Sequence, residues 1–470
     1  MKIEQIYTGC LAHAAYYLEC NGEAAIFDPL REVQPYIERA KKDNSKIKYV
    51  FETHFHADFV SGHLDLAKKT GADIVYGPTA KPNFDAIVAE DGQLFKIGNC
   101  TVKAIHTPGH TLESTTYLVI DETGKSHGII SGDTLFIGDV GRPDLAQHVI
   151  AELTEEKLAA MLFDSLRNKI MTLPDDLIVY PNHGAGSACG KNMSKETTDT
   201  LGHQKEVNYA LNPALTKEKF IKDLLTGLTA PPSYFPSNVL LNIKGYESFD
   251  SVVEKAMHAY NVNDFELIAN ETEALVLDTR NAEDFKNGFI PNSINIGLEG
   301  SFAQWVGEMI TDINQKILLI TYENKAEEAI TRLSRVGYDG VIGYLEGGFN
   351  AWLDANKSIE TIERENADAL AIQYTQKPLI IDVRKKSEFD SEHIVGALNI
   401  PLNQINQHLA EIPKKQHFFL HCAGGYRSMI AASILKQRGW YNFTEIRGGF
   451  AEMAKTSLPK TNYVCPTTLL

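Results

Sequence analysis

The most chemically suggestive residues of the chain are histidines and aspartates that directly follow apolar segments. The string YVFETHFHADFVSGH places His54, His56 and Asp58 at alternate positions after an apolar run that ends at Phe51. In an extended loop, alternate side chains project to one side, so this spacing is typical of metal ligands. The sequence therefore predicts a metal site just beyond the end of a buried strand.

Three later segments have the same construction. His110 in HTPGHTLEST, Asp133 in GIISGDTLF and His183 in VYPNHGAG each stand at the end of an apolar, strand-like run. Loops after strand ends are where α/β folds gather functional residues. A single loop histidine usually has no special role, but this series of segments in this order favours one common site.

The series resembles the metallo-β-lactamase superfamily, and the resemblance covers residues 1–190. It implies a four-layer αββα sandwich with metal ligands on loops at one edge. In the dinuclear hydrolases of the superfamily, such as glyoxalase II, a histidine follows the aspartate of the first motif, and here Phe59 takes that place. An aromatic ring has no lone pair to donate, so a second metal loses a ligand and a mononuclear centre is favoured.

Among superfamily members with one metal, the persulfide dioxygenases bind Fe(II) through residues that correspond here to His54, His110 and Asp133. Two histidines and a carboxylate leave positions open for a substrate thiolate and for O₂, as non-haem iron oxygenases require. The resemblance thus implies one Fe(II) per chain, with zinc as a possible substitute. The other motif residues either orient these ligands or contact metal themselves: His56, Asp58 and His183.

Arg142 and Cys189 lie near these motifs in the sequence. Arg142, in GDVGRPDL, resembles an arginine beside the iron of the same family. It could bind an anionic part of a thiol substrate through its two-point fork, or form a structural salt bridge. Cys189, in HGAGSACGK, could be an accessory thiol near the iron or a structural residue.

The cysteines as a set do not predict a disulfide framework or a structural zinc site. The chain has six of them and no C-x-x-C spacing. Three lie among apolar residues and are expected to be core residues: Cys10, Cys20 and Cys100.

The second half of the chain contains an internal repeat. ALVLDTRNAEDFKNGFIPNSINI, from Ala274, returns as PLIIDVRKKSEFDSEHIVGALNIPL, from Pro378. Each copy alternates short β-branched runs with helical stretches, which indicates two similar α/β domains. A polar, helical, linker-like stretch from Ser194 to Glu247 precedes them. The predicted domains are 1–246, a metallo-β-lactamase-like domain with a helical extension, 247–360 and 361–470.

A second chemical site is predicted in the last repeat, where HFFLH runs into CAGGYRSMIAASILKQRGW. Cys422 ends the strand, two glycines let the backbone turn tightly, and a helix follows to about Gln437. Backbone N–H groups in such a turn, with a helix N-terminus behind them, form an anion nest that stabilises a persulfide. A structural cysteine is the alternative.

The segment resembles the rhodanese sulfurtransferases, including their DVR and GG elements at Asp382, Arg384, Gly448 and Gly449. The resemblance implies that the catalytic residues are Cys422 and Arg427. These two enclose four residues, whereas the related phosphatase loop is one residue longer, so sulfane sulfur is the better substrate. The implied persulfide loop consists of Ala423, Gly424, Gly425, Tyr426 and Ser428.

The first copy keeps the aspartate, the arginine and the glycine pair of these elements. It has LLITYENKAEEA where the persulfide loop should be, and Tyr322 is aligned with Cys422. Without a thiol and with several glutamates, this copy cannot hold a persulfide. Packing or docking is its expected role.

Composition limits the remaining possibilities. The chain has 470 residues and a net charge of −16, which fits several domains and disfavours nucleic-acid and membrane partners. No signal peptide or apolar run of about 18 residues is seen, so a cytoplasmic protein is expected.

The resemblances together imply a persulfide dioxygenase fused to a rhodanese. Its substrate would be a thiol persulfide, such as that of glutathione or coenzyme A, oxidised by O₂ to sulfite in sulfide detoxification. Cys422 would feed sulfur to the dioxygenase or pass it to sulfite to give thiosulfate. A zinc thioesterase of the glyoxalase II type and a non-enzymatic sulfur carrier or sensor are the alternatives. A homo-oligomer is possible, and the sequence decides neither the thiol nor the direction of transfer.

Overall fold

Two six-stranded sheets form the centre of the N-terminal half of the computed structural model, which describes residues 1–470 except 146–152, 192, 229 and 466–470. The described chain divides into two units, Met1–Val252 with Thr331–Asp339, and Val253–Ile330 with Gly340–Leu470. The predicted domain limits at residues 247 and 361 stay predictions. Among the described residues, no helix combines the length and apolarity that crossing a membrane requires.

The strands of the first unit follow the apolar runs of the sequence. The first sheet contains, in order, β1 (Lys2–Thr8), β2 (His13–Cys20), β3 (Glu23–Phe27), β4 (Lys46–Phe51), β5 (Asp73–Tyr76) and β6 (Ile87–Val88). The second contains, in order, β12 (Asp199–Thr200), β11 (Ile178–Pro181), β10 (Ser126–Gly132), β9 (Thr115–Ile120), β8 (Cys100–His106) and β7 (Leu94–Ile97).

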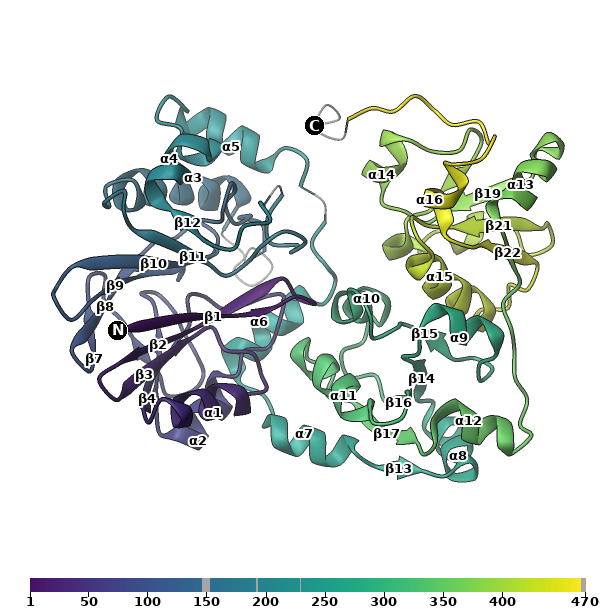
Figure 1. The fold of residues 1–470 in the computed structure, drawn as a ribbon, viewed down its shortest axis with the longest axis horizontal. Coiled ribbons are helices and arrows are strands. Elements are labelled where there is room, and N and C mark those ends of the chain that lie inside the picture. Colours follow the sequence, from purple (N-terminus) through teal and green to yellow (C-terminus); the bar gives the residue numbers. More distant parts are fainter. Residues whose placement is uncertain (146–152, 192, 229, 466–470) are drawn as a thin grey trace. The chain divides into compact units, whose positions relative to one another are not determined.

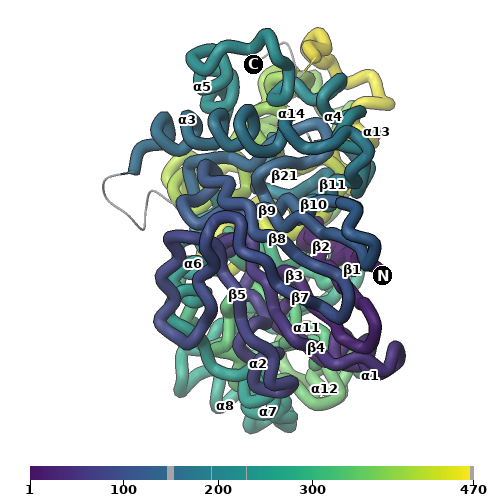
Figure 2. The backbone as a smooth tube through the Cα atoms, turned by 90° about the vertical axis from the view of Figure 1, so that its left-hand side faces the viewer, coloured from purple at the N-terminus to yellow at the C-terminus, as the bar shows by residue number. Residues whose placement is uncertain are grey.

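Both faces of these sheets are covered. In β2, Tyr16 and Leu18 enter the core between the sheets, whereas Ala15 and Tyr17 enter the core beneath the helices of the first sheet. This explains why β2 reads as continuously apolar, because alternate side chains of a strand point to opposite faces. Figures 1 and 2 show helices outside each sheet, and the predicted αββα sandwich is therefore confirmed.

The helices of this unit divide between the two outer faces. The first sheet packs against α1 (Gln34–Lys42) and α2 (His63–Thr70). The second packs against α3 (Glu155–Ser165), the π-helix η1 (Leu166–Ile170), α4 (Leu201–Val207), the 3₁₀ helix η2 (Tyr209–Leu211) and α5 (Lys217–Leu225). Two further helices follow: α6 (Phe235–Lys244) and α7 (Phe249–Ala256).

The polar stretch expected to be linker-like is helical but is not a free linker. Phe220 and Leu224 of α5 are buried in the same apolar cluster as Leu162 of α3. Asn242 of α6 is fully buried and donates hydrogen bonds to the carbonyl oxygens of His56 and Phe59, each at 2.8 Å. Apolar spacing within a polar composition thus makes this extension part of the first unit.

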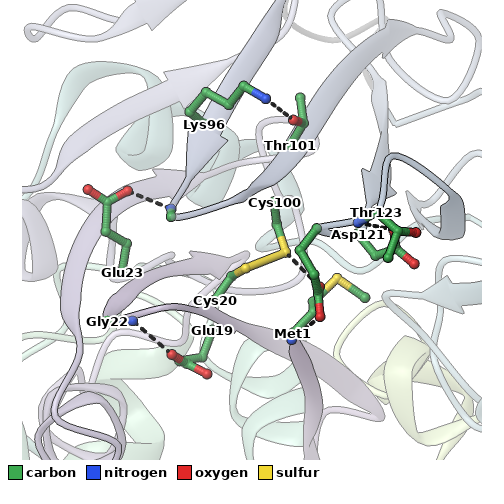
Figure 3. Close-up of a disulfide and its surroundings, with 12 residues drawn as sticks. Met1, Glu19, Cys20, Gly22, Glu23, Lys96, Cys100, Thr101, Asp121 and Thr123 are labelled. Atoms are coloured by element: carbon green, nitrogen blue, oxygen red, sulfur yellow. Dashed lines mark hydrogen bonds and ion pairs between the residues drawn. A yellow bond between two sulfur atoms is a disulfide. The ribbon is translucent and has the colours of Figure 1, made fainter.

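A disulfide links the two sheets, which corrects the expectation that Cys20 and Cys100 are unpaired core residues. Cys20 ends β2, Cys100 begins β8, and their Cα atoms lie 6.1 Å apart across the inter-sheet core (Figure 3). Both residues are buried as expected, but the pairing brings together positions 80 residues apart in sequence. Cys10 is only half-buried, so its assignment to the core is also wrong.

The second unit contains two parallel five-stranded sheets of the same strand order. The first copy has, in order, β13 (Ala259–Tyr260), β17 (Val341–Leu345), β16 (Ile317–Ile320), β14 (Leu275–Asp278) and β15 (Ile294–Asn295). The second has, in order, β18 (Arg364–Glu365), β22 (Phe443–Ile446), β21 (Phe418–His421), β19 (Leu379–Asp382) and β20 (Leu398–Asn399). The internal repeat therefore gives two similar α/β folds, as predicted.

Helices of matching position accompany the two sheets. The first copy has α8 (Val262–Thr272), α9 (Ala282–Asn287), α10 (Phe302–Met309), α11 (Ala326–Arg335) and α12 (Gly348–Asp354). The second has α13 (Ala367–Gln373), η3 (Tyr374–Gln376), α14 (Lys386–Ser391), η4 (Leu402–Gln404), η5 (Leu409–Glu411), α15 (Tyr426–Gln437) and α16 (Gly449–Met453). The α15 helix starts directly behind the Cys422 loop, as the sequence predicts.

Candidate active sites

Three predicted metal ligands converge at one edge of the αββα sandwich. His54 follows β4, His110 follows β8 and Asp133 follows β10. The Nε2 atoms of His54 and His110 lie 4.0 and 3.4 Å from Oδ2 of Asp133. All three side chains are buried, and their donor atoms lie within 4.8 Å of one another.

The other ring nitrogens of both histidines are held by protein groups. Nδ1 of His110 donates to the carbonyl oxygen of Arg142 at 2.7 Å, and Nδ1 of His54 lies 2.9 Å from Oγ1 of Thr53. The Nε2 atom of each ring is thereby turned toward Asp133. Burial, and then the neighbouring His56 and His110 rings, hold the pKa of His54 well below its usual range, which keeps the imidazole neutral as a metal ligand must be.

The Asp133 carboxylate provides the clearest sign that the group fits a metal ion. Neither of its oxygens has a hydrogen-bond partner among the described residues, although the side chain is buried. A buried carboxylate without partners is costly, and a bound cation removes that cost. Gly141 leaves room beside it, since a Cβ there would lie 2.1 Å from the carbonyl oxygen of Asp133 and 2.9 Å from Nδ1 of His110.

The ring of His56 lies beside that of His54, with centroids 4.2 Å apart, but its Nε2 atom is engaged by carboxylates outside the His54–His110–Asp133 group. Nε2 of His56 donates to Oδ1 of Asp28 at 2.9 Å and lies 3.4 Å from Oε2 of Glu52. Burial opposes protonation, but these two carboxylates raise the pKa of His56 well above its usual range. His56 therefore belongs with Asp28 and Glu52 to a buried cluster of ionisable groups separate from the His54–His110–Asp133 group.

Asp28 and Glu52 were missed by sequence reasoning. Oδ1 of Asp28 also accepts a hydrogen bond from the backbone N–H of Thr53 at 2.7 Å, and its Oδ2 accepts one from Asn182 at 2.9 Å. Asp28 thus ties together the loops that carry His54 and His183. The pattern that identified the predicted ligands also applies to Asp28, because Asp28 stands directly after the apolar run AAIF of β3.

Asp58, His183 and Cys189 form a second convergent group beside the first. Nε2 of His183 lies 3.5 Å from Oδ2 of Asp58 and 3.6 Å from Oδ1 of Asp133, and the three donor atoms lie within 4.8 Å of one another. Burial, and then the carboxylates of Asp58 and Asp133, raise the pKa of the Cys189 thiol well above its usual range. That environment disfavours a reactive thiolate at Cys189.

Phe59 and Arg142 complete the surroundings of the ligands. The Phe59 ring is fully buried, with its centroid 4.3 Å from those of both His13 and His56. Nε of Arg142 donates to Oδ1 of Asp144 at 2.6 Å, and its Nη2 donates to the other oxygen of the same carboxylate. The structural salt bridge that the sequence allowed for Arg142 is thus present, and a role in substrate binding stays a prediction.

In the second rhodanese-like copy, Cys422 lies where the sequence predicted, at the end of β21 and before α15. The thiol is buried, and the backbone N–H of Gly425 points at its Sγ at 3.1 Å. Gly425 has a φ of +109°, a left-handed value that glycine adopts without strain. One backbone N–H of the loop therefore faces the sulfur, and a complete anion nest stays a prediction.

Arg427 forms a two-point ion pair with Glu388 of α14, with Nη1–Oε2 and Nη2–Oε1 distances of 2.6 and 2.8 Å. Burial opposes ionisation of Glu388, but the guanidinium lowers the pKa of that carboxyl below its usual range. Arg427 is thus held at the base of the loop by a charged partner.

In the first copy, strand register shows that Thr321, not Tyr322, stands at the position of Cys422. Asp278 pairs with Ile320 just as Asp382 pairs with His421, so the residues that follow these strands correspond. Asn324, with φ of +60°, then matches Gly425, and Ala326 matches Arg427. The loop has therefore lost both the thiol and the guanidinium, and aligning Tyr322 with Cys422 was wrong by one residue.

Comparisons with known proteins agree with this architecture. The family model described as Metallo-beta-lactamase superfamily matches residues 8–183, and that described as Rhodanese-like domain matches residues 261–355 and 365–456. A solved structure of a metallo-beta-lactamase from Staphylococcus aureus is 34% identical and covers 73% of this chain and 99% of its own, with a TM-score of 0.66.

Curated relatives match part of the chain. A hydroxyacylglutathione hydrolase of Rhizobium etli is 36% identical over 35% of this chain and 58% of its own length. Human persulfide dioxygenase ETHE1, mitochondrial, is 28% identical over 43% of this chain and 70% of its own length. The chain is therefore similar to relatives with two different named activities.

Proposed function

Because the chain belongs to the metallo-β-lactamase superfamily and carries two rhodanese-like domains, we propose that it is a persulfide dioxygenase joined to a sulfurtransferase. The proposed substrate is a low-molecular-weight thiol persulfide, such as that of glutathione or coenzyme A. The balanced reaction is RSSH + O₂ + H₂O → RSH + SO₃²⁻ + 2H⁺. The outer sulfur loses four electrons, and O₂ gains them.

The proposal depends on the His54–His110–Asp133 group and on the fully buried ring of Phe59, which lies against His56. Fe(II) held by these residues would supply the one-electron chemistry that lets O₂ react with a bound thiolate. Phe59 occupies the position where a dinuclear hydrolase has a further ligand, and it leaves an apolar wall instead. His56, hydrogen-bonded to Asp28, would hold the ligand loop in place.

The proposed role of Cys422 is to carry sulfane sulfur. Its thiolate would attack the outer sulfur of thiosulfate, forming Cys–S–S⁻ and releasing sulfite, and the reverse step would return sulfur to sulfite. The N–H of Gly425, 3.1 Å from Sγ, is placed to stabilise the negative charge on sulfur. This cycle uses the same sulfite that persulfide oxidation produces.

The central test measures metal content and O₂ uptake on the same preparation. We expect about one iron per chain and O₂ uptake only with glutathione persulfide or coenzyme A persulfide present. Asp133→Ala should abolish both, because it removes the ligand that both histidines face, whereas Asp144→Asn should leave iron content unchanged. Two tightly bound zinc ions with O₂-independent thioester cleavage would contradict the proposal.

Metal-dependent thioester hydrolysis is the second candidate function. One observation favours it: Cys189 lies with Asp58 and His183 where a second metal could bind, and a thiolate could replace the ligand lost at Phe59. Cys189→Ser separates the two candidates. It should leave iron content and persulfide-dependent O₂ uptake unchanged if the centre is mononuclear, and it should remove half of the bound metal if the centre is dinuclear.

Coupling between the two activities has its own test. With persulfide and O₂, the intact chain should yield mostly thiosulfate, because the tether holds the rhodanese at high effective concentration beside the source of sulfite. Cys422→Ser should yield mostly sulfite at a similar rate of O₂ uptake. Equal product ratios in both proteins would mean that the rhodanese does not use the dioxygenase product.

A further inference from the structure

The immediate surroundings of the Cys422 sulfur include two buried polar groups that the sequence did not single out together. Oγ of Ser428 lies 3.4 Å from Sγ and donates to Oε1 of Glu445 at 2.6 Å. Glu445, at the end of β22, has no exposed surface, and neither has Ser428. A buried carboxylate therefore sets the position of the hydroxyl group that faces the reactive sulfur.

Arg364 neutralises this carboxylate and links it to the first copy. Its Nε donates to Oε2 of Glu445, and its Nη1 donates to Oε1 of Glu283 on α9. Its Nη2 would lie 3.7 Å from a Cβ built on Gly425, so the guanidinium lies directly beneath the persulfide loop. The pair of Arg364 with Glu445 is buried, whereas 55% of the Glu283 side chain is exposed, so loss of Arg364 would leave the Glu445 carboxylate buried without its cation.

A second set of contacts runs along α15, the helix behind the sulfur. The hydroxyl of Tyr426 donates to the carbonyl oxygen of Gly297 at 2.8 Å, and Oγ of Ser433 accepts from the N–H of Asn295 at 2.9 Å. Nε2 of Gln437 donates to the carbonyl oxygen of Asn292 at 3.0 Å. Figure 1 shows α15 beside β15 and α9 of the first copy, in agreement with their contacts.

The three donors and acceptors on α15 are spaced by seven and four residues, which places them on one face of the helix. The first copy therefore touches the active loop from two directions. Glu283 holds Arg364 beneath the loop, and the segment from Asn292 to Gly297 holds the whole length of α15.

We propose that the silent first copy is a working part of the Cys422 site, because it positions the Arg364–Glu445–Ser428 chain and the α15 helix around the reactive sulfur. Arg364 is a positioning residue that acts through Glu445 and Ser428. This inference rests on the proposed sulfur transfer for its kinetic readout, but the reactivity of the Cys422 thiol reports on it independently.

The test compares Arg364→Met, Arg364→Lys and Glu283→Gln with wild type in two assays. One is sulfur transfer from thiosulfate, and the other is alkylation of Cys422 by iodoacetamide, followed by mass spectrometry. Iodoacetamide is neutral, so its rate reports on the position and ionisation of the sulfur and not on anion binding. Glu266→Gln is the matched control, because it breaks another ion pair of the first copy, with Lys357 at 2.6 Å, and leaves both ion pairs of Arg364 intact.

We expect Arg364→Met to lower kcat and the alkylation rate by about tenfold, with a smaller change in KM. Arg364→Lys should recover part of both losses, and Glu283→Gln should lower both by about threefold because the tie to the first copy is lost while the pair with Glu445 remains. Glu266→Gln should match wild type. Persulfide-dependent O₂ uptake should stay at the wild-type rate in every variant, because the substitutions lie outside the His54–His110–Asp133 group.

Wild-type rates in Arg364→Met and Glu283→Gln, with unchanged melting temperatures, would overturn the inference. If Arg364→Met does not fold, Tyr426→Phe removes only the hydroxyl that binds Gly297 and should lower the alkylation rate by about twofold. A wild-type chain without sulfur transfer would contradict the proposed function, whereas the alkylation rates would still decide whether the first copy positions the sulfur.

Discussion

The two rhodanese-like copies share a structural frame and differ in one loop. In each copy an aspartate that ends a strand binds an arginine two residues later, with an Nη2–Oδ2 distance of 2.6 Å, and the guanidinium lies 4.0 Å from a phenylalanine ring. These residues are Asp278, Arg280 and Phe349 in the first copy, and Asp382, Arg384 and Phe450 in the second.

The loops beyond these frames carry different chemistry on a similar backbone. Thr321 replaces Cys422, and Ala326 replaces Arg427. The carboxylate of Asp284, at the position of Glu388, instead accepts a hydrogen bond from the hydroxyl of Tyr322. The shared aspartate, arginine and phenylalanine therefore stabilise the fold whether or not the catalytic loop is present. Sulfur transfer requires the other side chains of the loop as well as the thiol.

The largest expected effect is the loss of sulfur transfer when the Cys422 thiol is removed. Cys422→Ser should lower sulfur transfer from thiosulfate by at least about 100-fold, because a serine hydroxyl is a poor nucleophile for sulfane sulfur. Iron content and O₂ uptake should stay at wild-type levels. Retained sulfur transfer would identify another thiol as carrier, and Cys189 would be tested next.

The second test introduces the residues of the Cys422 loop into the loop of the first copy. In a Cys422→Ser background, Thr321→Cys alone should give no sulfur transfer, because the position of Arg427 is still an alanine. Adding Tyr322→Ala, Glu323→Gly, Asn324→Gly, Ala326→Arg and Glu327→Ser should give measurable activity of a few per cent of wild type, about tenfold above background. Activity in the single variant would show that the frame and a thiol suffice.

Removing the shared arginine should affect both copies alike. Arg280→Met and Arg384→Met each leave a fully buried carboxylate without its cation, and each should cost about 3–5 kcal/mol of unfolding free energy. Urea unfolding followed by circular dichroism measures the loss. A much smaller cost in one copy would mean that its ion pair no longer contributes to the frame.

The smallest expected effect is that of Tyr322→Phe. The Tyr322 side chain is partly exposed, and its hydroxyl donates to Asp284 and accepts from the N–H of Asn281 at 3.1 Å, so the loss of stability should stay below about 2 kcal/mol. Sulfur transfer should not change. A large change in transfer would give the first loop a role that its side chains do not suggest.

Features located at the ends of strands were predicted well from the sequence. His54, His110, Asp133 and Cys422 each come after an apolar run, and the fold places each at a strand end, where the first three converge. The αββα sandwich and the paired α/β folds were predictable from the same runs and from the repeat.

Features that depend on contacts between distant segments could not be predicted. Cys20 and Cys100 face each other only because β2 and β8 lie on opposing sheets. Likewise, Arg364 meets Glu283 and Glu445 only once both copies have folded. The register of Thr321 was missed for a different reason, since aligning the loops by sequence alone leaves a one-residue ambiguity that strand pairing removes.

Asn324 has a further consequence for how such a duplicated chain changes over time. Its left-handed backbone, with φ of +60°, preserves the turn that Gly425 makes in the active copy, and asparagine is one of the few residues that tolerates this conformation. A duplicated domain could therefore exchange its loop side chains stepwise while its main chain kept the same path. Loss of the thiol would then cost little folding free energy. A copy without sulfur-transfer activity would stay folded and be retained for a structural role beside the active copy.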